Sequence, residues 1–431
     1  MNNFQTILTA VFVAFFVLAV LIFSGIIKVG AGTNAATTPT GKIVIWGTFD
    51  STPDFLNVFQ NMTGGNNDLT ISYVKKDKAT YQQDLIEAFA EGAGPDLFII
   101  TPDMIIKNQN FIYTIPYASY PQATFQDSFI DGASIYESAD GTVAFPIVVD
   151  PMVMYYNKDI LSSAGLSQPP TSWSDMLNLA PTLTSKQDNG TILQSMIALG
   201  RFDNVSNAKS ILATLLIQNN NPIMERTATG YTSVLEADTT LSADNALNFF
   251  TQFSDPSNSA YSWNSSLPQS IDMFTQGKLA FYLGHASELF TIQATNPNLS
   301  FDVAPVPQLA TATAKRTDAD IYAIAVNKKS QNLAAAFGVA GLLSTGDNAQ
   351  AFATALSLPP ALRSLLAVKP TDPYLFTFFN QAIISQSWLD PDPVQSDAIF
   401  SELVDNIVSS KLSTGDALSK AQGELQLLVN N

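Results

Sequence analysis

The sequence contains no cysteine and only one histidine, His285. Without cysteine, the chain can form no disulfide framework, no thiolate zinc site, no cysteine nucleophile and no lipid link through an N-terminal cysteine. One histidine alone also makes metal sites built from several imidazoles impossible. We therefore expect no metal site and no cofactor.

Charged residues are scarce and the two signs are unequal. They make up 13% of the chain, with 20 basic and 37 acidic residues, which gives a formal net charge of −17. This sign repels phosphate backbones and anionic headgroups, so nucleic acid is not an expected partner. The 46% of hydrophobic residues argues against disorder and for a sizeable core. At 431 residues the chain is long enough for two lobes.

The longest uncharged run lies at the N-terminus, where Ile7 to Ile27 form 21 residues without a charge. At about 1.5 Å per helical residue, this run spans the roughly 30 Å hydrocarbon core of a bilayer. We predict a transmembrane anchor over residues 1–27 and a flexible linker over 28–41, which is small, polar and turn-forming. The alternative is a cleaved signal peptide, because residues 29–31 are small, although its hydrophobic segment would be unusually long. Charge does not set the orientation, since residues 1–6 contain no Lys or Arg.

Short β-branched runs alternate with helical periodicity after the linker. Strands are predicted at 42–46, 69–74 and 97–100, and an amphipathic helix at 81–91. Further helices are predicted at 173–183, 333–343, 375–385, 398–408 and 417–428. This alternation predicts an α/β fold with a largely parallel sheet.

Two loops after predicted strands carry polar side chains. In a parallel sheet, the loops at the carboxyl ends of the strands line the ligand crevice. Candidate ligand-binding residues in these loops are Thr48, Asp50, Ser51, Thr101 and Asp103. The two aspartates are the main candidates, because an ionised carboxylate accepts hydrogen bonds from neighbouring hydroxyls.

Residues 144–156 form a long apolar, β-rich run that is interrupted by Asp150 and Pro151. A charge inside a strand is unfavourable unless it is paired, and a proline weakens the strand locally. Two interpretations stay open: a chain crossing between domains with a solvated aspartate, or a carboxylate at the floor of a cleft.

Several segments resemble, in order, the extracellular solute-binding proteins of family 1, which include maltose-binding protein. The resemblance covers roughly residues 42–430 and is strongest in the third of these segments. They are KIVIWGTFDSTPDFLNVFQNMTG, GPDLFIITPDMI, FPIVVDPMVMYYNKDILSSAGLSQPPTSWSDML, MFTQGKLAFYLGHASELF, IYAIAVNKKSQNLAAAFGVAGLL and ALSKAQGELQ.

The resemblance implies a two-lobed periplasmic-binding-protein-like fold of type II. Its hinge strands would cross near 148–153 and 321–326. The N-terminal lobe would comprise 42–150 and 325–370, and the C-terminal lobe 151–324 and 371–431.

The resemblance also implies which residues contact the ligand. Asp50 and Asp103 match loop carboxylates that accept hydrogen bonds from sugar hydroxyls, and Asp150 matches an acidic residue on the crossing strand. Departures occur at Ile100 and at residues 284–287, which stand where maltose-binding relatives have tryptophans, so a maltodextrin ligand is not expected. Other candidates are Tyr231, Trp263, Phe400, His285 and Ser287, and the aromatic residues and His285 can equally be core residues.

The resulting prediction is the substrate-binding component of an ABC importer, not an enzyme. It would be a monomer anchored in the cell membrane, with its body on the extracytoplasmic side, and would present a sugar or oligosaccharide to permease subunits. One alternative is a secreted, anchored glycoside hydrolase that uses two carboxylates as acid and base, although the sequence has no GxSxG and no HExxH motif. The other is a sensor or adhesion module on the same fold.

Overall fold

The computed structural model describes residues 39–63, 68–236 and 242–430. The chain from Gly41 onward forms one compact unit. The predicted anchor over 1–27 and most of the predicted linker lie outside the described residues. Among the helices of the described ranges, none combines the length and the apolar character that a bilayer crossing requires.

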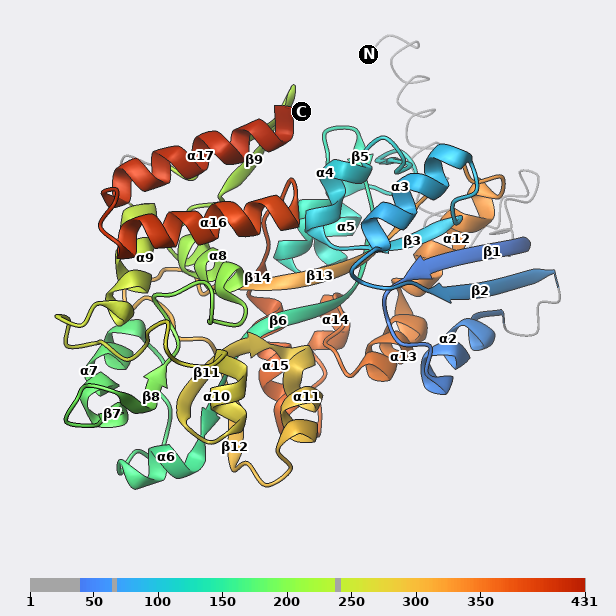
Figure 1. Cartoon of the computed structure of the whole chain (residues 1–431). Coiled ribbons are helices and arrows are strands. Elements are labelled where there is room, and N and C mark those ends of the chain that lie inside the picture. The colour runs from blue at the N-terminus through green and yellow to red at the C-terminus, as the bar shows by residue number, and fades with distance from the viewer. Residues whose placement is uncertain (1–38, 64–67, 237–241, 431) are drawn as a thin grey trace, which may run out of the picture. The chain divides into compact units, whose positions relative to one another are not determined.

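One mixed sheet of ten strands runs through this unit (Figure 1). Its strand order is β2-β1-β3-β13-β6-β11-β8-β7, with β12 also paired to β6 and β14 to β13. Two separate pairs, β4 with β5 and β9 with β10, complete the strands of the described chain. The strands are β1 Gly41–Gly47, β2 Leu69–Lys75, β3 Leu97–Ile100, β4 Ile115–Pro116, β5 Gly141–Thr142, β6 Phe145–Asn157, β7 Ser185–Lys186, β8 Ile192–Ile197, β9 Met224–Thr227, β10 Gly230–Ser233, β11 Leu279–His285, β12 Phe301–Ala304, β13 Thr317–Val326 and β14 Ser385–Gln386.

The prediction of a largely parallel sheet was wrong in one respect. Strand β1 is parallel to β2 and β3, and β11 is parallel to β8. The central strands β6 and β13, however, run antiparallel to each other and to β3, β11 and β12. Parallel neighbours require a strand-helix-strand crossover, and the chain does not enter β6 and β13 through such a connection from the strands that they pair with.

Strands β6 and β13 join the two halves of the sheet. The first part of β6 pairs with β13, whereas its second part, from Met152 onward, pairs with β11 and β12. Strand β13 pairs with β3 through its last four residues, Ala323 to Val326. In the β6–β13 ladder Asp150 and Asp320 are direct partners, so their side chains lie on the same face of the sheet.

Helices cover both halves of the sheet. Helix α12 packs against β1, β6 and β13, α8 packs against β13, and α15 packs against β6. Of the predicted helices, those at 81–91, 173–183 and 333–343 have the observed bounds, as does the strand at 97–100. The helices are α2 Pro53–Thr63, α3 Tyr81–Glu91, α4 Ile105–Asn108, α5 Gln122–Ser128, α6 Lys158–Ser163, α7 Trp173–Leu183, α8 Ala208–Gln218, α9 Ser242–Thr251, α10 Ser270–Thr275, α11 Leu289–Thr295, α12 Leu333–Leu343, α13 Gly346–Leu356, α14 Arg363–Leu366, α15 Pro373–Ile383, α16 Pro393–Val408 and α17 Thr414–Asn430.

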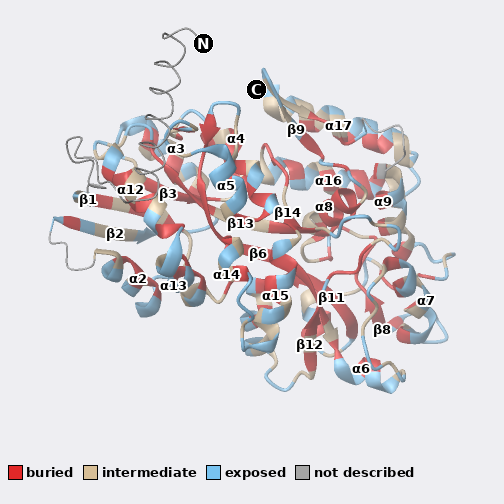
Figure 2. Cartoon of the chain, turned by 180° about the vertical axis from the view of Figure 1, so that it is seen from behind, coloured by how far each residue is buried: buried red, intermediate tan, exposed pale blue. Residues whose placement is uncertain are grey.

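The central strands are the most deeply buried part of the molecule (Figure 2). All but one of the residues of β6 are buried, as are all four of β3. Burying this apolar area supplies the main stabilisation of the fold. The burial also means that any carboxylate on these strands sits in a poorly solvated environment, which is where the candidate site lies.

Candidate functional site

A cavity of about 190 Å³ opens where β1 and β3 end and β13 passes beside them. Its position at the carboxyl ends of parallel strands is where ligands bind in open α/β sheets. It contains three of the predicted residues, Thr48, Thr101 and Asp103. The complete lining is Thr48, Lys78, Tyr81, Gln82, Ile99, Ile100, Thr101, Asp103, Met104, Asp320, Tyr322 and Pro393.

Asp103 is placed by the turn that follows β3. Thr101 is extended, Pro102 begins a short 3₁₀ turn, and the Thr101 hydroxyl donates a hydrogen bond to the Asp103 carboxylate. Burial raises the pKa of Asp103 to about 6, and repulsion from Asp320 raises it as well. The hydrogen bond from Thr101 lowers this pKa and offsets part of the shift. The turn therefore presents to the cavity a buried carboxylate that, among the described residues, accepts a side-chain hydrogen bond from Thr101 alone.

Asp320 on β13 is the second carboxylate of the cavity, and the sequence analysis missed it. Within the described part of the chain, no group donates a hydrogen bond to the Asp320 carboxylate. Its ladder partner Asp150 is buried and accepts a hydrogen bond of 2.9 Å from the Ser287 backbone N–H, so it does not line the cavity. Burial raises the pKa of Asp150, and the nearby His285 opposes this shift.

His285 lies behind these carboxylates at the end of β11. Its Nδ1 is 3.1 Å from the Asp150 carbonyl oxygen, and its Nε2 is 3.3 Å from Ser210 Oγ. Burial alone would lower the pKa of His285, but four carboxylates, led by Asp150 and Asp320, raise it to about 9. Burial also raises the pKa of Asp318 to about 7, against the attraction of His285. His285 is thus a buried cation at neutral pH, and it is not among the residues that line the cavity.

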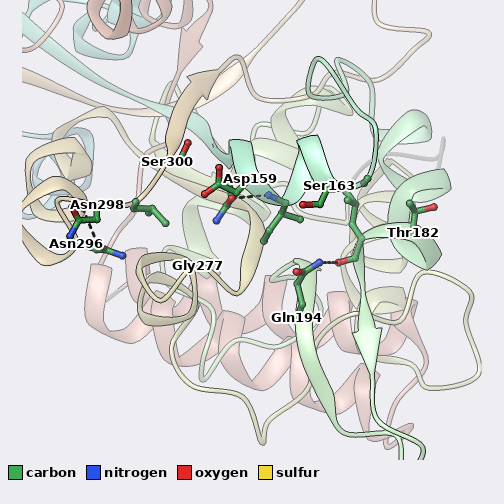
Figure 3. A pocket seen from close by; sticks show the side chains of 13 residues that line it. Asp159, Ser163, Thr182, Gln194, Gly277, Asn296, Asn298 and Ser300 are labelled. Carbon is green, nitrogen blue, oxygen red and sulfur yellow. Dashed lines mark hydrogen bonds between the residues drawn. The ribbon is translucent and has the colours of Figure 1, made fainter.

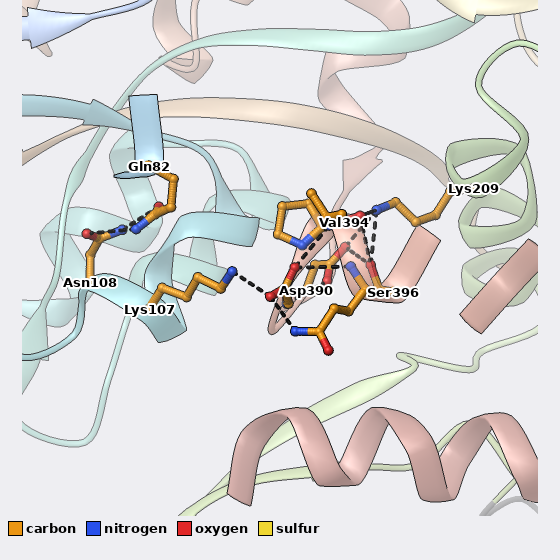
Figure 4. A network of polar contacts seen from close by, with 10 residues as sticks. Gln82, Lys107, Asn108, Lys209, Asp390, Val394 and Ser396 are labelled. Carbon is orange, nitrogen blue, oxygen red and sulfur yellow. Dashed lines mark hydrogen bonds and ion pairs between the residues drawn. The ribbon is translucent and has the colours of Figure 1, made fainter. Parts of the chain in front are cut away.

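Two ion pairs flank the cavity at the start of α16 (Figure 4). Lys107 of α4 lies 2.7 Å from the Asp392 carboxylate, which also caps the N-terminus of α16. Partial burial opposes ionisation, but hydrogen bonds from Lys107 and Gln395 lower the pKa of Asp392 to about 2. Lys209 of α8 lies 3.0 Å from Asp390. These contacts fix the segment that carries the lining residue Pro393.

Lys209 has no free hydrogen-bond donor for a ligand. Besides Asp390, its ammonium group donates to the Pro393 carbonyl oxygen at 2.8 Å and to Ser396 Oγ at 3.0 Å. An ammonium group has three donors, and these contacts use all of them.

Two tyrosines line the cavity, of which Tyr81 is buried and Tyr322 is half-buried. The Tyr81 hydroxyl donates to the backbone oxygens of Ile99 at 2.9 Å and Trp46 at 3.0 Å, which fixes its ring. The centroid of the Tyr322 ring lies 4.8 Å from the centroid of the Phe49 ring. Sequence reasoning missed both rings. The alternation of Asp318, Asp320 and Tyr322 in an otherwise apolar strand was the available signal for β13.

The predicted aromatic residues lie elsewhere. Trp263 is fully buried and its indole N–H donates to Asn204 Oδ1, while Phe400 is buried against Trp388. Neither ring can offer a free face to a ligand. Tyr231, on β10, lines a different depression beside Arg226.

The remaining predicted residues do not line the cavity either. Asp50 is an ion-pair partner of Lys75, and its side chain is 77% exposed. Ser51 and Ser287 are exposed. Ser287 nevertheless supplies the backbone donor to Asp150.

Larger depressions lie away from these strand ends. One of about 440 Å³ is formed by α6, β8 and the loop before β12 (Figure 3). Its amide side chains hold backbone groups in place: Asn157 caps α6, Asn296 donates to the Thr275 carbonyl oxygen, and Gln194 donates to that of Leu183. Another, of about 540 Å³, lies where Arg226 of β9 donates to the Glu137 carbonyl oxygen.

Solved structures of binding proteins share this fold. The cyclic α-maltosyl-1,6-maltose binding protein from Arthrobacter globiformis aligns with a TM-score of 0.74 and 18% identity over 90% of this chain and 99% of its own. The sugar-binding protein MalE from Xanthomonas citri aligns with a TM-score of 0.71 and 15% identity over 90% of this chain and 97% of its own. A solute-binding protein from Thermotoga lettingae, solved with α-D-tagatose, aligns with a TM-score of 0.65 and 16% identity over 90% of this chain and 100% of its own. The predicted two-lobed α/β solute-binding fold is thus confirmed.

Sequence comparison gives a shorter match and a longer one. A putative binding protein of Brucella abortus is 27% identical over 125 residues, which is 29% of this chain and 30% of that relative. The match therefore spans less than a third of the curated relative. The family model of bacterial extracellular solute-binding proteins matches residues 51–361. Because this match covers more than half of the chain, the chain belongs to the bacterial extracellular solute-binding proteins.

Proposed function

We propose that the chain is the substrate-binding component of an ABC importer and that it captures a sugar in the 190 Å³ cavity. The observation that carries this proposal is the convergence of two carboxylates, two hydroxyls and two tyrosine rings on that cavity. Carboxylates accept hydrogen bonds from neighbouring hydroxyls, while aromatic rings pack on the apolar face of a sugar ring.

In the proposed cycle, solute binding closes the two lobes about β6 and β13. A ligand drives closure only if it contacts both lobes better in the closed state. Asp103 and Pro393, at the start of α16, both line the cavity and lie in different lobes of the division proposed here. We infer lobes comprising 42–150 with 325–370 and 151–324 with 371–431, so that Lys107 and Asp392 belong to different lobes.

The proposed cellular setting follows from the N-terminal sequence and from the family. Family membership implies that the folded body lies on the extracytoplasmic side. We propose that residues 1–27 stay attached as a membrane anchor, that 28–41 form a linker, and that the body works as a monomer facing permease subunits. The uncharged run Ile7–Ile27 supports the anchor.

Isothermal titration calorimetry of the full-length chain against a panel of monosaccharides and oligosaccharides tests the sugar assignment. We expect one sugar to bind with micromolar or tighter affinity and to be recovered chemically unchanged. Cleavage of a bound oligosaccharide would instead favour the hydrolase alternative. Tight binding of an amino acid or peptide, with no sugar bound, would contradict the proposal.

A further inference from the structure

The cavity is smaller than the sites of most organic ligands. Pockets for drug-sized molecules begin at about 300 Å³, whereas this one has about 190 Å³. Pro393 lines the cavity, and the Lys107–Asp392 pair of 2.7 Å holds the segment that contains it. The available space therefore fits one sugar ring and not a chain of rings.

The charges around the cavity are unbalanced. Asp103 and Asp320 line it, and the only lining cation among the described residues is the exposed Lys78. The other cations close by are already engaged: Lys209 by Asp390, Pro393 and Ser396, and His285 next to Asp150. Glu288 adds further negative charge near His285.

Asp320 is the half-buried carboxylate of this cavity. Its carboxylate faces the cavity, receives no hydrogen bond within the described part of the chain, and stands opposite Asp150 in the β6–β13 ladder. Like charges at directly opposite ladder positions destabilise a sheet. A positive group in the cavity would relieve the repulsion that Asp320 exerts on Asp103 and Asp150.

A metal ion is a poor candidate for this positive group. Among the described residues, no group of three His, Asp or Glu side chains is arranged to hold one. The cavity also contains features that a bare ion does not use, namely the hydroxyls of Thr48 and Thr101 and the rings of Tyr81 and Tyr322. These suit a hydroxylated ring, and aromatic faces also attract cations.

We propose that the preferred ligand is a cationic amino sugar of a single ring, whose ammonium group pairs with Asp320 and Asp103. This inference rests on the proposed function, since it takes the cavity to be a sugar site and specifies the sugar. The ring hydroxyls bind Thr48, Thr101 and the remaining carboxylate oxygens, and the apolar ring face lies against Tyr322.

Calorimetry with matched sugars tests the charge requirement on the full-length chain at pH 6.5, where the sugar amine is protonated. Each set contains a neutral hexose, the 2-amino sugar of the same configuration and its N-acetyl derivative, in the gluco, galacto and manno series. We expect the amino sugar of one series to bind at least about tenfold more tightly than both partners, a difference of about 1.4 kcal/mol, since hydrogen bonds between charged groups are stronger than neutral ones. Raising the salt concentration to 0.5 M should reduce this preference.

Asp320→Asn tests the residue that carries the inference, with Asp159→Asn in the distal depression as the matched control. We expect the preference to fall below about threefold in Asp320→Asn and to keep its full size in Asp159→Asn. If Asp320→Asn is unfolded by circular dichroism, the salt dependence of the unmodified chain decides in its place.

The outcomes separate the two proposals. Equal or tighter binding of the neutral hexose, of the N-acetyl sugar or of an oligosaccharide overturns the amino-sugar inference and leaves the sugar-binding function in place. Tighter binding of a diamine such as putrescine than of any sugar overturns both, as does the absence of binding by every sugar tested.

Discussion

The strand-end cavity and the distal depression of Figure 3 differ in what their polar groups do. The depression is more than twice as large, but its amides are used to hold α6, β8 and nearby loops in place. In the smaller cavity, the Asp320 carboxylate has no donor within the described chain, and Asp103 has only its neighbour Thr101. Carboxylates that are not used to hold the backbone, rather than volume, therefore distinguish the candidate site.

Truncating a cavity carboxylate should have the largest effect. We expect Asp103→Ala to weaken sugar binding roughly 10- to 150-fold, because it removes hydrogen bonds to a charged group worth about 1.5–3 kcal/mol. Calorimetry against the sugar found in the panel measures this loss. Asn298→Ala in the depression is the matched control and should change the affinity less than about twofold. Equal losses in the two variants would mean that the comparison between the sites is wrong.

The buried carboxylates should also make stability depend on pH. The pKa of Asp318 rises from 3.8 to about 7 on folding. Between these values the unfolded chain has lost the proton that the folded chain retains, so the free energy of unfolding falls as pH rises from 4 to 7. Asp103, whose pKa rises to about 6, acts in the same direction.

We expect Asp318→Asn to reduce the total fall in the free energy of unfolding between pH 4 and 7 by an amount on the order of 2 kcal/mol, since the folded state no longer has to hold that proton. Urea unfolding at several pH values measures it. Asn298→Ala removes no titratable group and should keep the original slope. A variant slope identical to that of the unmodified chain would show that Asp318 ionises normally.

His285 extends the pH dependence to higher values. Its pKa rises from 6.5 to about 9 on folding, so its favourable contribution is complete below pH 6.5 and is lost as pH rises to 9. We expect His285→Gln to reduce the decline of stability between pH 6.5 and 9, again measured by urea unfolding. Without such a reduction, His285 would be neutral in the folded protein.

The ion pair beside the cavity should have the smallest effect. We expect Lys107→Ala to weaken sugar binding at most about fivefold, mainly through faster dissociation, since partly exposed pairs contribute roughly 0.2–1 kcal/mol. Stopped-flow kinetics measure the rate. Lys75→Ala breaks the exposed pair with Asp50 and serves as the control, with no change expected. A larger effect in the control would place the ligand near Asp50.

Sequence periodicity predicted much of the fold because local patterns determine it. The helices at 81–91 and 173–183 have apolar residues at helical spacing, and the second begins after the capping serine Ser172. The direction of β6 and β13 was not predictable in this way, because a buried strand has the same apolar pattern whether its neighbours are parallel or antiparallel.

The candidate site was predictable only in part. Thr48, Thr101 and Asp103 follow strands directly, so position in the chain was enough to find them. Asp320 and Tyr322 lie inside a strand, and only the β6–β13 register brings them to the cavity. Trp263 has an aromatic side chain like a sugar-stacking residue, but burial, which depends on tertiary packing, gives it a core role.

Helix α16 links the cavity to a distant surface. Its first residue, Pro393, lines the cavity, and its 16 residues extend about 24 Å to a helix end beside α17. A rigid rod that is tilted at one end moves most at the other. A solute that displaced Pro393 would thus also displace the far end of α16, beside α17.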